Sequence, residues 1–333
     1  MSRSATVVDV AAAAGVSRQT VSNVLNAPDV VAPATRERVE RAIATLGYRP
    51  HASARRLRTR QSSTLGVRLD PVLNGISGAV LDRFLHALVE SADGRGMRIL
   101  LFTAADPADE IEQFGRLVDG SDVDGFVLTS TFHDDPRTSW LLEHDIPFVT
   151  FGRPWGLPDM ESAPFPWVDV DGAAGLRDAT RHLLQLDRHR IAFLGWPAPS
   201  GQGDERRRGW RDEMRVRLPA SEADQLDLAC EDDVTAAART VSEAIARGRS
   251  FDAVVCASDT LAIGARIATG GSVPVVGYDN TPVAAALGLS SIEQPLIEAA
   301  RSAIELLMGA SGRSVLPPTA GHRLLAPRPV WRT

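Results

Sequence analysis

At the N-terminus, the pattern of hydrophobic and polar positions predicts two short helices joined by a tight turn. Residues 7–14 follow Thr6, a residue type that caps helix starts, and Gly15 supplies the left-handed residue that ends this helix. Ser17 then caps a second helix over residues 18–25. Two helices separated by so short a glycine-containing turn are typical of a helix-turn-helix.

The second predicted helix has an apolar and a polar face. Val21, Val24 and Leu25 recur at the spacing of a buried stripe. A third helix opens at Pro33 and has an apolar face of its own, made of Val39, Ala42, Ile43 and Leu46. The polar face of the second helix offers guanidinium and amide groups that pair with bases, and hydroxyls that bind phosphate. These side chains are Ser17, Arg18, Gln19, Thr20, Ser22 and Asn23.

Charge is distributed unevenly along the chain. The net charge of the 333 residues is −6, yet residues 1–63 hold ten Arg against four Asp and Glu, which is +6 and leaves −12 for the remainder. A basic head on an acidic body suits a protein whose N-terminal module alone meets phosphate. A generic three-helix domain with a solvated polar face would not explain this charge split, so the pattern favours DNA binding.

From residue 65 onward, short apolar runs alternate with amphipathic segments, which predicts parallel sheets covered by helices. The expected strands are residues 65–69, 99–103, 125–128, 148–151, 191–194, 253–257 and 273–276. The expected helices lie near residues 80–92, 110–117, 173–186, 206–216, 236–246 and 261–268.

Ligands of open parallel sheets bind beyond the carboxyl ends of the strands. Polar residues stand at several of these ends, and Arg206 opens one predicted helix. Any single Asp or Ser there is more often a helix cap or a turn residue. A ring of carboxylates with one Arg nevertheless suits hydrogen bonding to sugar hydroxyls. The candidates for stacking on a sugar ring are Trp140, Trp155, Trp167, Trp196 and Trp210, although most of them are expected in the core or on the surface. Trp196 directly follows a strand and is preferred, whereas Trp210 is expected in the core.

Other classes of function find little support. Hydrophobic residues make up 44% and charged residues 23%, which is typical of a globular protein. With no signal-peptide pattern and no apolar run long enough for a bilayer, we expect a cytoplasmic protein without membrane contact. Phosphate-binding loops, nucleophile elbows and clusters of His or Cys are missing, so we expect no enzyme, no cofactor and no metal. A sugar-binding protein of a transport system remains the alternative, although the basic head speaks against it.

Several segments resemble the lactose/galactose repressor family. In the head these are residues 6–17 (TVVDVAAAAGVS), 19–26 (QTVSNVLN), 46–50 (LGYRP) and 54–57 (ARRL). The resemblance implies that Arg18, Gln19 and Asn23 read bases and that a hinge helix inserts Leu57 into the minor groove. His51 stands where the family usually has Asn. The full set of implied DNA contacts is Thr6, Ser17, Arg18, Gln19, Thr20, Ser22, Asn23, Asn26, His51, Ala54, Arg55 and Leu57.

The composition and length of the hinge are informative without the family resemblance. Residues 50–58 form a short basic stretch with one leucine, too short to be a helix by itself. A helix here would need DNA and a second subunit to stabilise it. Apolar wedges that unstack a base step are a known minor-groove device.

The resemblance extends through the body, in VDVDG (168–172), RIAFLG (190–195), RRRGW (206–210), GYDNT (277–281) and SIEQP (291–295). It implies an effector cleft between two lobes of periplasmic-binding-protein type. The implied lining, with the preferred stacking residue, is Asp70, Thr129, Asp171, Trp196, Arg206, Ser258, Asp279 and Gln294. Ser258 replaces a commoner Asn, so the identity of the effector does not transfer.

The fold class expected is therefore an all-α helix-turn-helix head plus an α/β two-lobed periplasmic-binding-protein-like effector domain. The expected domains are 1–47 for DNA binding, 48–63 for the hinge and 64–333 for effector binding and dimerisation. Lobe 1 is expected at about 64–186 and 296–318, and lobe 2 at about 187–295 and 319–333. The chain is interpreted as a sequence-specific transcriptional repressor, a homodimer on pseudo-palindromic double-stranded operator DNA, controlled by a sugar or glycoside.

Overall fold

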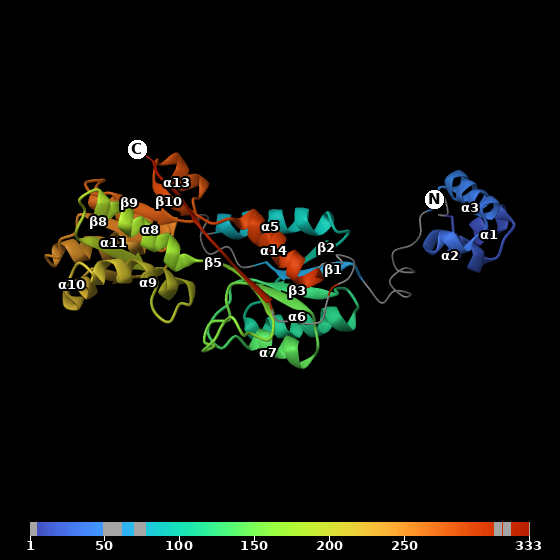
Figure 1. The fold of residues 1–333 in the computed structure, drawn as a ribbon, viewed down its shortest axis with the longest axis horizontal. Helices are drawn as coiled ribbons and strands as arrows, with labels where there is room; N and C mark the ends of the chain where they lie inside the picture. The colour runs from blue at the N-terminus through green and yellow to red at the C-terminus, as the bar shows by residue number, and fades with distance from the viewer. Residues whose placement is uncertain (1–4, 49–61, 70–77, 310–314, 316–320, 333) are drawn as a thin grey trace. The chain divides into compact units, whose positions relative to one another are not determined.

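The computed structural model describes residues 5–48, 62–69, 78–309, 315 and 321–332 (Figure 1). Its contacts divide the chain into two compact units, residues 1–62 and 63–333, called here the head and the body.

The head is a three-helix domain. Its elements are α1 (Val7–Ala14), α2 (Arg18–Asn26), the short 3₁₀ helix η1 (Pro28–Val30) and α3 (Pro33–Leu46). Thr6 caps α1 in a reciprocal capping box with Asp9, and Gly15 ends it at φ 61°. Val10, Val21 and Val39 are fully buried where the three helices meet.

Two leucines of the head do not lie where the pattern predicts. Leu25 is 36% exposed and Leu46 is 39% exposed, although both were assigned to apolar faces. Leu25 follows Val24, which takes the buried position of that turn, and Leu46 lies in the last turn of α3, beyond the buried Ala42. The core of so small a domain ends before the helices do.

The body contains one parallel and one predominantly parallel sheet, each covered by helices, so the expected fold class is confirmed. The first sheet has the order β11-β5-β4-β3-β1-β2 and is parallel throughout. Its strands are β1 (Thr64–Arg68), β2 (Arg98–Phe102), β3 (Gly125–Leu128), β4 (Phe148–Phe151), β5 (Pro166–Val170) and β11 (Gly321–Leu325). Its helices are α5 (Gly78–Asp93), α6 (Pro107–Asp119), α7 (Pro136–Glu143) and α14 (Leu296–Met308). Helices α5 and α14 lie side by side on one face, and α6 and α7 cover the other (Figure 1).

The second sheet has the order β12-β10-β9-β8-β6-β7, in which only β12 runs antiparallel. Its strands are β6 (Ile191–Gly195), β7 (Asp227–Ala229), β8 (Ala253–Cys256), β9 (Val275–Tyr278), β10 (Ser290–Glu293) and β12 (Arg328–Val330). Its helices are α8 (Gly172–Gln185), α9 (Gln202–Arg215), α10 (Ala220–Gln225), α11 (Val234–Ala246), α12 (Asp259–Thr269) and α13 (Pro282–Ala286).

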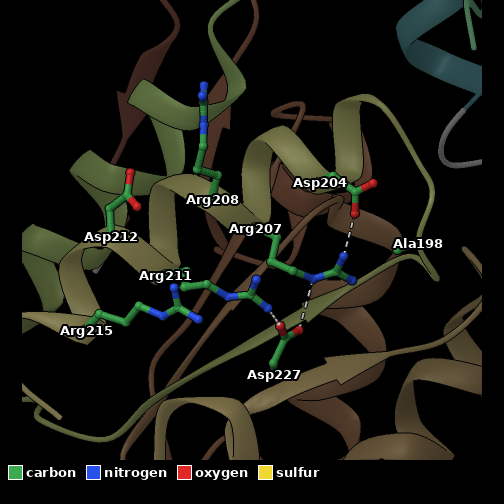
Figure 2. Close-up of a pocket in the computed structure, with 8 residues that line it drawn as sticks. All are labelled: Ala198, Asp204, Arg207, Arg208, Arg211, Asp212, Arg215 and Asp227. Atoms are coloured by element: carbon green, nitrogen blue, oxygen red, sulfur yellow. Dashed lines mark hydrogen bonds and ion pairs between the residues drawn. The ribbon is translucent and has the colours of Figure 1, made fainter. Parts of the chain in front are cut away.

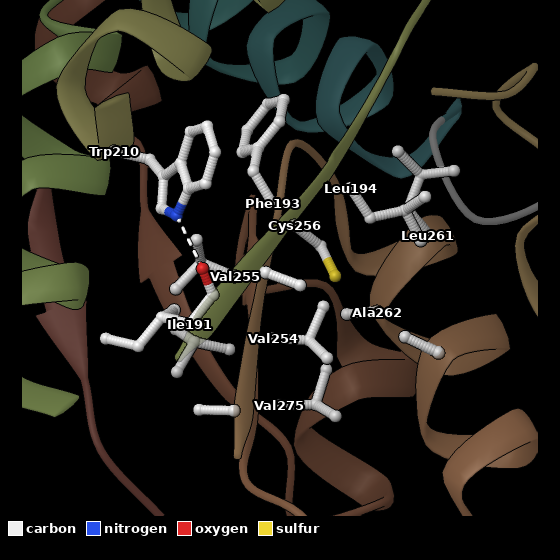
Figure 3. Packing of buried hydrophobic residues seen from close by; sticks show 14 of the residues in the cluster. Ile191, Phe193, Leu194, Trp210, Val254, Val255, Cys256, Leu261, Ala262 and Val275 are labelled. Carbon is white, nitrogen blue, oxygen red and sulfur yellow. Dashed lines mark hydrogen bonds between the residues drawn. The ribbon is translucent and has the colours of Figure 1, made fainter. Parts of the chain in front are cut away.

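The core of the second sheet is built from strand residues and the helix faces that cover them (Figure 3). Trp210 of α9 is fully buried, as expected, and its Nε1 donates to the carbonyl oxygen of Ile191 at 3.0 Å. Its indole packs beside the ring of Phe193, with 5.5 Å between ring centres. Trp210 therefore fastens α9 to β6, which places the first turns of α9 at the end of this sheet.

The expected lobe limits differ from this arrangement in two places. Helix α8 was assigned to lobe 1, yet its apolar face, with Leu176 and Leu183, lies in the core of the second sheet. Strand β11 was assigned to lobe 2, yet it pairs with β5 in the first sheet. An amphipathic pattern shows that one face of a helix is buried, but it does not show which sheet does the burying.

A charged cluster is buried beneath α6 and α7, on the face of the first sheet that these two helices cover. Arg137 has 1% of its side chain exposed and pairs with Glu110 at 2.9 Å and with Asp135 at 2.6 Å. Its Nη2 also donates to the carbonyl oxygens of Thr129 and Ser130, directly after β3. Arg137 thus compensates two buried carboxylates and holds the backbone that follows a central strand.

We expect Arg137→Met to lower the free energy of unfolding by about 3–5 kcal/mol, because it removes the ion-pair partner of the buried Asp135 and leaves the buried Glu110 with Arg68 alone. The control is Arg116→Met, since Arg116 pairs with Glu112 on the exposed face of α6. That change should cost less than about 1 kcal/mol. Denaturant titration of both variants measures the difference, and equal losses would contradict the role given to Arg137.

Candidate functional site

The polar face of α2 is held in place by its cap and by a pair within the helix. Ser17 accepts a hydrogen bond from the backbone N–H of Thr20 at 3.1 Å and contacts the Thr20 hydroxyl at 2.9 Å. Gln19 donates to the side chain of Asn23 at 3.0 Å, one turn further on. Arg18 and Gln19 are exposed, so the first turn of α2 presents donors and acceptors to solvent.

The remaining predicted DNA contacts divide into three groups. The hydroxyl of Thr6 donates to Asp9 at 2.7 Å within the cap of α1, and Ser22 is half-buried on α2. Asn26 ends α2, and its side chain lies outside the described part of the structure. The hinge residues His51, Ala54, Arg55 and Leu57 also lie outside the described residues.

In the body, Arg206 is the centre of a buried polar cluster. It lies in the second turn of α9, which begins four residues earlier than predicted, and only 4% of the residue is exposed. Its Nη1 donates to the carbonyl oxygen of Ala257 at 2.5 Å, and its Nη2 lies 3.8 Å from Oδ1 of Asp279. The guanidinium carbon stands 3.7 Å from the centre of the Tyr278 ring, a cation–π contact.

Asp279 and Gln294 complete the cluster. Gln294 donates to Oδ1 of Asp279 at 2.7 Å, and both residues are buried. Asp279 has φ 105°, an uncommon backbone conformation for a residue other than glycine, of the kind that clusters at functional sites. Burial raises the pKa of Asp279 to about 7, against the opposing charge of Arg206.

Close packing of two helices brings Asp171 to the same region. A Cβ on Gly209 would stand 2.1 Å from the carbonyl oxygen of Ala173, so only glycine allows α9 to approach α8 this closely. Asp171 caps α8 by accepting from the N–H of Ala174 at 2.9 Å and is half-buried. For a single Asp at a strand end, the sequence favoured a helix-cap role over a ligand-binding role. The hydrogen bond that Asp171 makes is that of a helix cap.

The other predicted cleft residues have separate surroundings. Ser258 caps α12 and donates to Asp232 at 2.5 Å, so its hydroxyl is already engaged. Thr129 is buried after β3, and its hydroxyl has no hydrogen-bond partner among the described residues. Trp196 is half-buried, with its ring centre 5.4 Å from the guanidinium carbon of Arg206. Asp70 lies outside the described residues.

The structure adds four residues that the sequence analysis did not select. Arg153, which follows β4, donates through Nε to Asp169 at 2.9 Å, and its Nη2 forms an ion pair with Glu205 of α9 at 3.0 Å. This ion pair joins the two lobes. Trp155 lies two residues further on and is 6% exposed. Applying the strand-end rule to residues 148–151 would have identified Arg153, whereas nothing in the pattern distinguishes Trp155 from the other tryptophans.

These residues enclose a small cavity between the lobes. It measures about 10 Å³, room for about one water molecule. Its lining consists of Trp155, Asp169, Val170, Gly172, Gln202, Glu205, Arg206 and Gln294. This cavity is too small for an organic ligand, so a ligand that binds among these residues requires the lobes to separate.

Several buried polar groups in or next to this region have no hydrogen-bond partner among the described residues. They include Nε1 of Trp155, Nε1 of Trp196, Nε of Arg206 and the hydroxyl of Tyr278. A buried polar group left unpaired costs about 1–3 kcal/mol. A ligand rich in acceptor oxygens could accept hydrogen bonds from these donors and remove that cost.

A larger pocket of about 550 Å³ lies along the outer side of α9 (Figure 2). Its arginines are largely paired with carboxylates. Arg207 bonds Asp204 at 2.6 Å and Asp227 at 3.1 Å, and Arg211 also pairs with Asp227. Arg207 further donates to the carbonyl oxygen of Trp196 at 2.7 Å. These bonds fasten α9 to β7 and to the segment after β6, which indicates a structural role.

The described residues contain no cluster of His, Cys, Asp and Glu that could hold a metal ion. Among the same residues, no helix is both long enough and apolar enough to cross a membrane.

Together, a helix-turn-helix head with an exposed polar face on its second helix and a two-lobed body with a buried polar cluster are typical of a ligand-responsive DNA-binding regulator. Two family models match the chain: residues 6–51 match "Bacterial regulatory proteins, lacI family", and residues 82–295 match "Periplasmic binding proteins and sugar binding domain of LacI family". The chain belongs to the lacI family of bacterial regulatory proteins. It is a transcriptional regulator, which decides against the transport-protein alternative.

Relatives of known name agree with this assignment. The HTH-type transcriptional regulator CelR of Thermobifida fusca is 35% identical over 314 residues, covering 90% of this chain and 89% of that protein. The structure of a transcriptional regulator CelR–cellobiose complex superposes with a TM-score of 0.70 at 30% identity, covering 98% and 99% of the two chains. The lac repressor dimer bound to operator and the anti-inducer ONPF has the same fold, with a TM-score of 0.79 at 24% identity over 99% and 98% of the chains.

We expect the stability that Asp279 contributes to fall as the pH rises. Folded Asp279 keeps its proton up to about pH 7, whereas an unfolded Asp ionises near about pH 3.9. The folded state therefore binds more protons between these values, and the contribution is present below about pH 4 and lost through about pH 7. Asp279→Asn cannot ionise, so the stability of the parent relative to this variant should fall between pH 5 and pH 8 in urea titrations. A difference that is constant or rises with pH would contradict the assignment.

Proposed function

We propose that this regulator represses transcription and that a neutral sugar or glycoside in the cleft controls its hold on DNA. The observation that carries the proposal is the buried cluster of Arg206, Asp279 and Gln294, next to unpaired donors at the strand ends. Sugar hydroxyls donate and accept at once, so one ring can satisfy both the carboxylate and the unpaired N–H groups.

The charge balance of the cleft favours a neutral ligand. Arg206 faces Asp279, and Arg153 is balanced by Asp169 and Glu205. An anionic ligand would meet these carboxylates, and a cationic one would meet the two guanidinium groups. The CelR structure in complex with cellobiose supports a saccharide as the class of ligand. In this proposal Asp70, Thr129, Asp171, Trp196 and Ser258 complete the lining.

For DNA, we propose that Arg18, Gln19 and Asn23 contact base edges in the major groove. The short hydroxyls of the capped helix starts then bind phosphate, and the hinge residues contact the minor groove. Because one helix-turn-helix reads one half-site, two copies of the chain would bind a pseudo-palindromic operator. The similar fold of the operator-bound lac repressor dimer supports this geometry. The protein would act where the DNA lies, in the cytoplasm, and catalyse no reaction.

Ligand control needs only a difference in affinity between two arrangements of the lobes. The Arg153–Glu205 ion pair joins the lobes next to a cavity of only about 10 Å³. A ligand that holds the lobes at another angle would change how two hinge segments face the operator. Coupling of about 1–3 kcal/mol is typical of such control.

We expect Arg18→Ala and Gln19→Ala to relax the choice of DNA sequence. Each well-formed base pairing contributes roughly 1–3 kcal/mol of discrimination. Selection from random DNA defines the operator, and competition binding then gives the ratio of specific to non-specific affinity. Arg41→Ala on the exposed face of α3 is the matched control and should leave that ratio unchanged. Parental ratios in both α2 variants would rule out α2 as the reading helix.

We expect Arg206→Met and Asp279→Asn to weaken saccharide binding roughly ten- to hundredfold, because each removes a hydrogen bond to a charged group. Calorimetry with cellobiose, lactose, maltose and sucrose measures the affinities, and operator binding without sugar reports that the protein is intact. Arg215→Met, a change on the exposed part of α9, is the control. Retention of parental sugar affinity by both cleft variants would place the effector elsewhere.

A further inference from the structure

Trp155 extends from lobe 1 to the surface of lobe 2. It follows β4 and is 6% exposed. On lobe 2 it meets Gly201, where an added Cβ would stand 2.8 Å from atoms of the indole ring. Gly201 has φ 28°, in the range that favours glycine, so the site of contact is formed by backbone alone. The indole therefore lies between the lobes and not in the core of either.

The Trp155 indole contacts a cation that is itself held in place by two carboxylates. The guanidinium carbon of Arg153 lies 5.1 Å from the Trp155 ring centre, a cation–π contact. Arg153 is itself held by Asp169 at 2.9 Å and by Glu205 at 3.0 Å. Because Arg153 is buried and paired, its contact with the indole limits the orientations that the Trp155 ring can take.

The same ring lines the cavity that contains Arg206 and Gln294. Its Nε1 is buried and has no hydrogen-bond partner among the described residues, so it is an uncommitted donor at the cleft. At about 10 Å³ the cavity admits no sugar in this arrangement, and among the described residues Trp155 is the only aromatic side chain in its lining. When the lobes separate, the indole becomes the apolar surface next to the Arg206 cluster.

We propose that Trp155 is the residue on which the sugar ring of the effector stacks, with its Nε1 donating to a ring hydroxyl. This inference rests on the proposed function and assigns the stacking role to lobe 1. Indoles offer a flat face with one polar edge, which matches the C–H face and the hydroxyl rim of a pyranose. Trp196, the tryptophan that the sequence favoured, does not line the cavity; it packs beside Arg206 and against Gly203.

Two substitutions distinguish an aromatic stacking role of Trp155 from a role that depends only on the size and shape of its side chain. Full-length Trp155→Phe and Trp155→Leu are titrated calorimetrically with cellobiose, lactose, maltose and sucrose beside the parent. Trp155→Phe keeps a stacking face and should bind within roughly tenfold of the parent, whereas Trp155→Leu should lose more than roughly tenfold. The control is Trp331→Leu. Trp331 is 39% exposed and stacks on His182, near the far end of α8 from Asp171.

If the Trp155→Leu variant binds sugar as tightly as the parent, or more tightly, the inference is overturned, because Trp155 would then only fill the small cavity. A parent that binds operator but none of the four sugars would overturn the proposed function as well, so the two failures are distinguishable. Indole fluorescence provides a second measurement that does not depend on the leucine variant. Its sugar-induced change should vanish in Trp155→Phe and persist in Trp331→Phe, and a change retained in full by Trp155→Phe would contradict stacking.

Discussion

Arg206 has to remain charged with 4% of its surface exposed, and the body is arranged to meet that requirement. A buried cation is tolerated only when nearby groups replace the water it has lost. Here a carbonyl oxygen after β8 accepts one hydrogen bond, the carboxyl group of Asp279 after β9 lies 3.8 Å from the guanidinium, and the ring of Tyr278 covers one face. The ends of neighbouring parallel strands therefore converge on one guanidinium, which is how this fold forms a polar cleft.

Three consecutive residues of α9 carry three different tasks. Glu205 forms the ion pair with Arg153 across the lobes, and Arg206 enters the cleft. Arg207 ties the helix to Asp227 at the edge strand of the second sheet. Because the three side chains share one helix, α9 connects the lobe contact, the cleft and the edge of the second sheet. The closeness of α8, which Gly209 allows, holds this helix in place from the other side.

The sequence predicted most of the elements but not all of their partners. Alternation of apolar runs and amphipathic segments located seven of the strands, whereas β5, β7, β10, β11 and β12 were missed. Strand β5 contains Asp169, a buried charge that only its pairing with Arg153 makes possible, and β12 contains Pro329, which an edge strand tolerates. In the cleft, strand ends indicated Asp279, and family resemblance alone indicated Gln294. Trp155 was one of five tryptophans considered for stacking but was not preferred, because a tryptophan in an irregular loop has no periodicity to place it.

In the proposed mechanism, sugar and operator favour two different arrangements of one protein. Thermodynamic linkage tests it most directly, because each ligand must change the affinity of the other by the same factor. Sugar affinity is measured by calorimetry with and without saturating operator, and operator affinity is measured with and without saturating sugar. The account predicts two equal factors, each roughly 5- to 150-fold. Sugar that binds with the same affinity whether or not operator is present would contradict it.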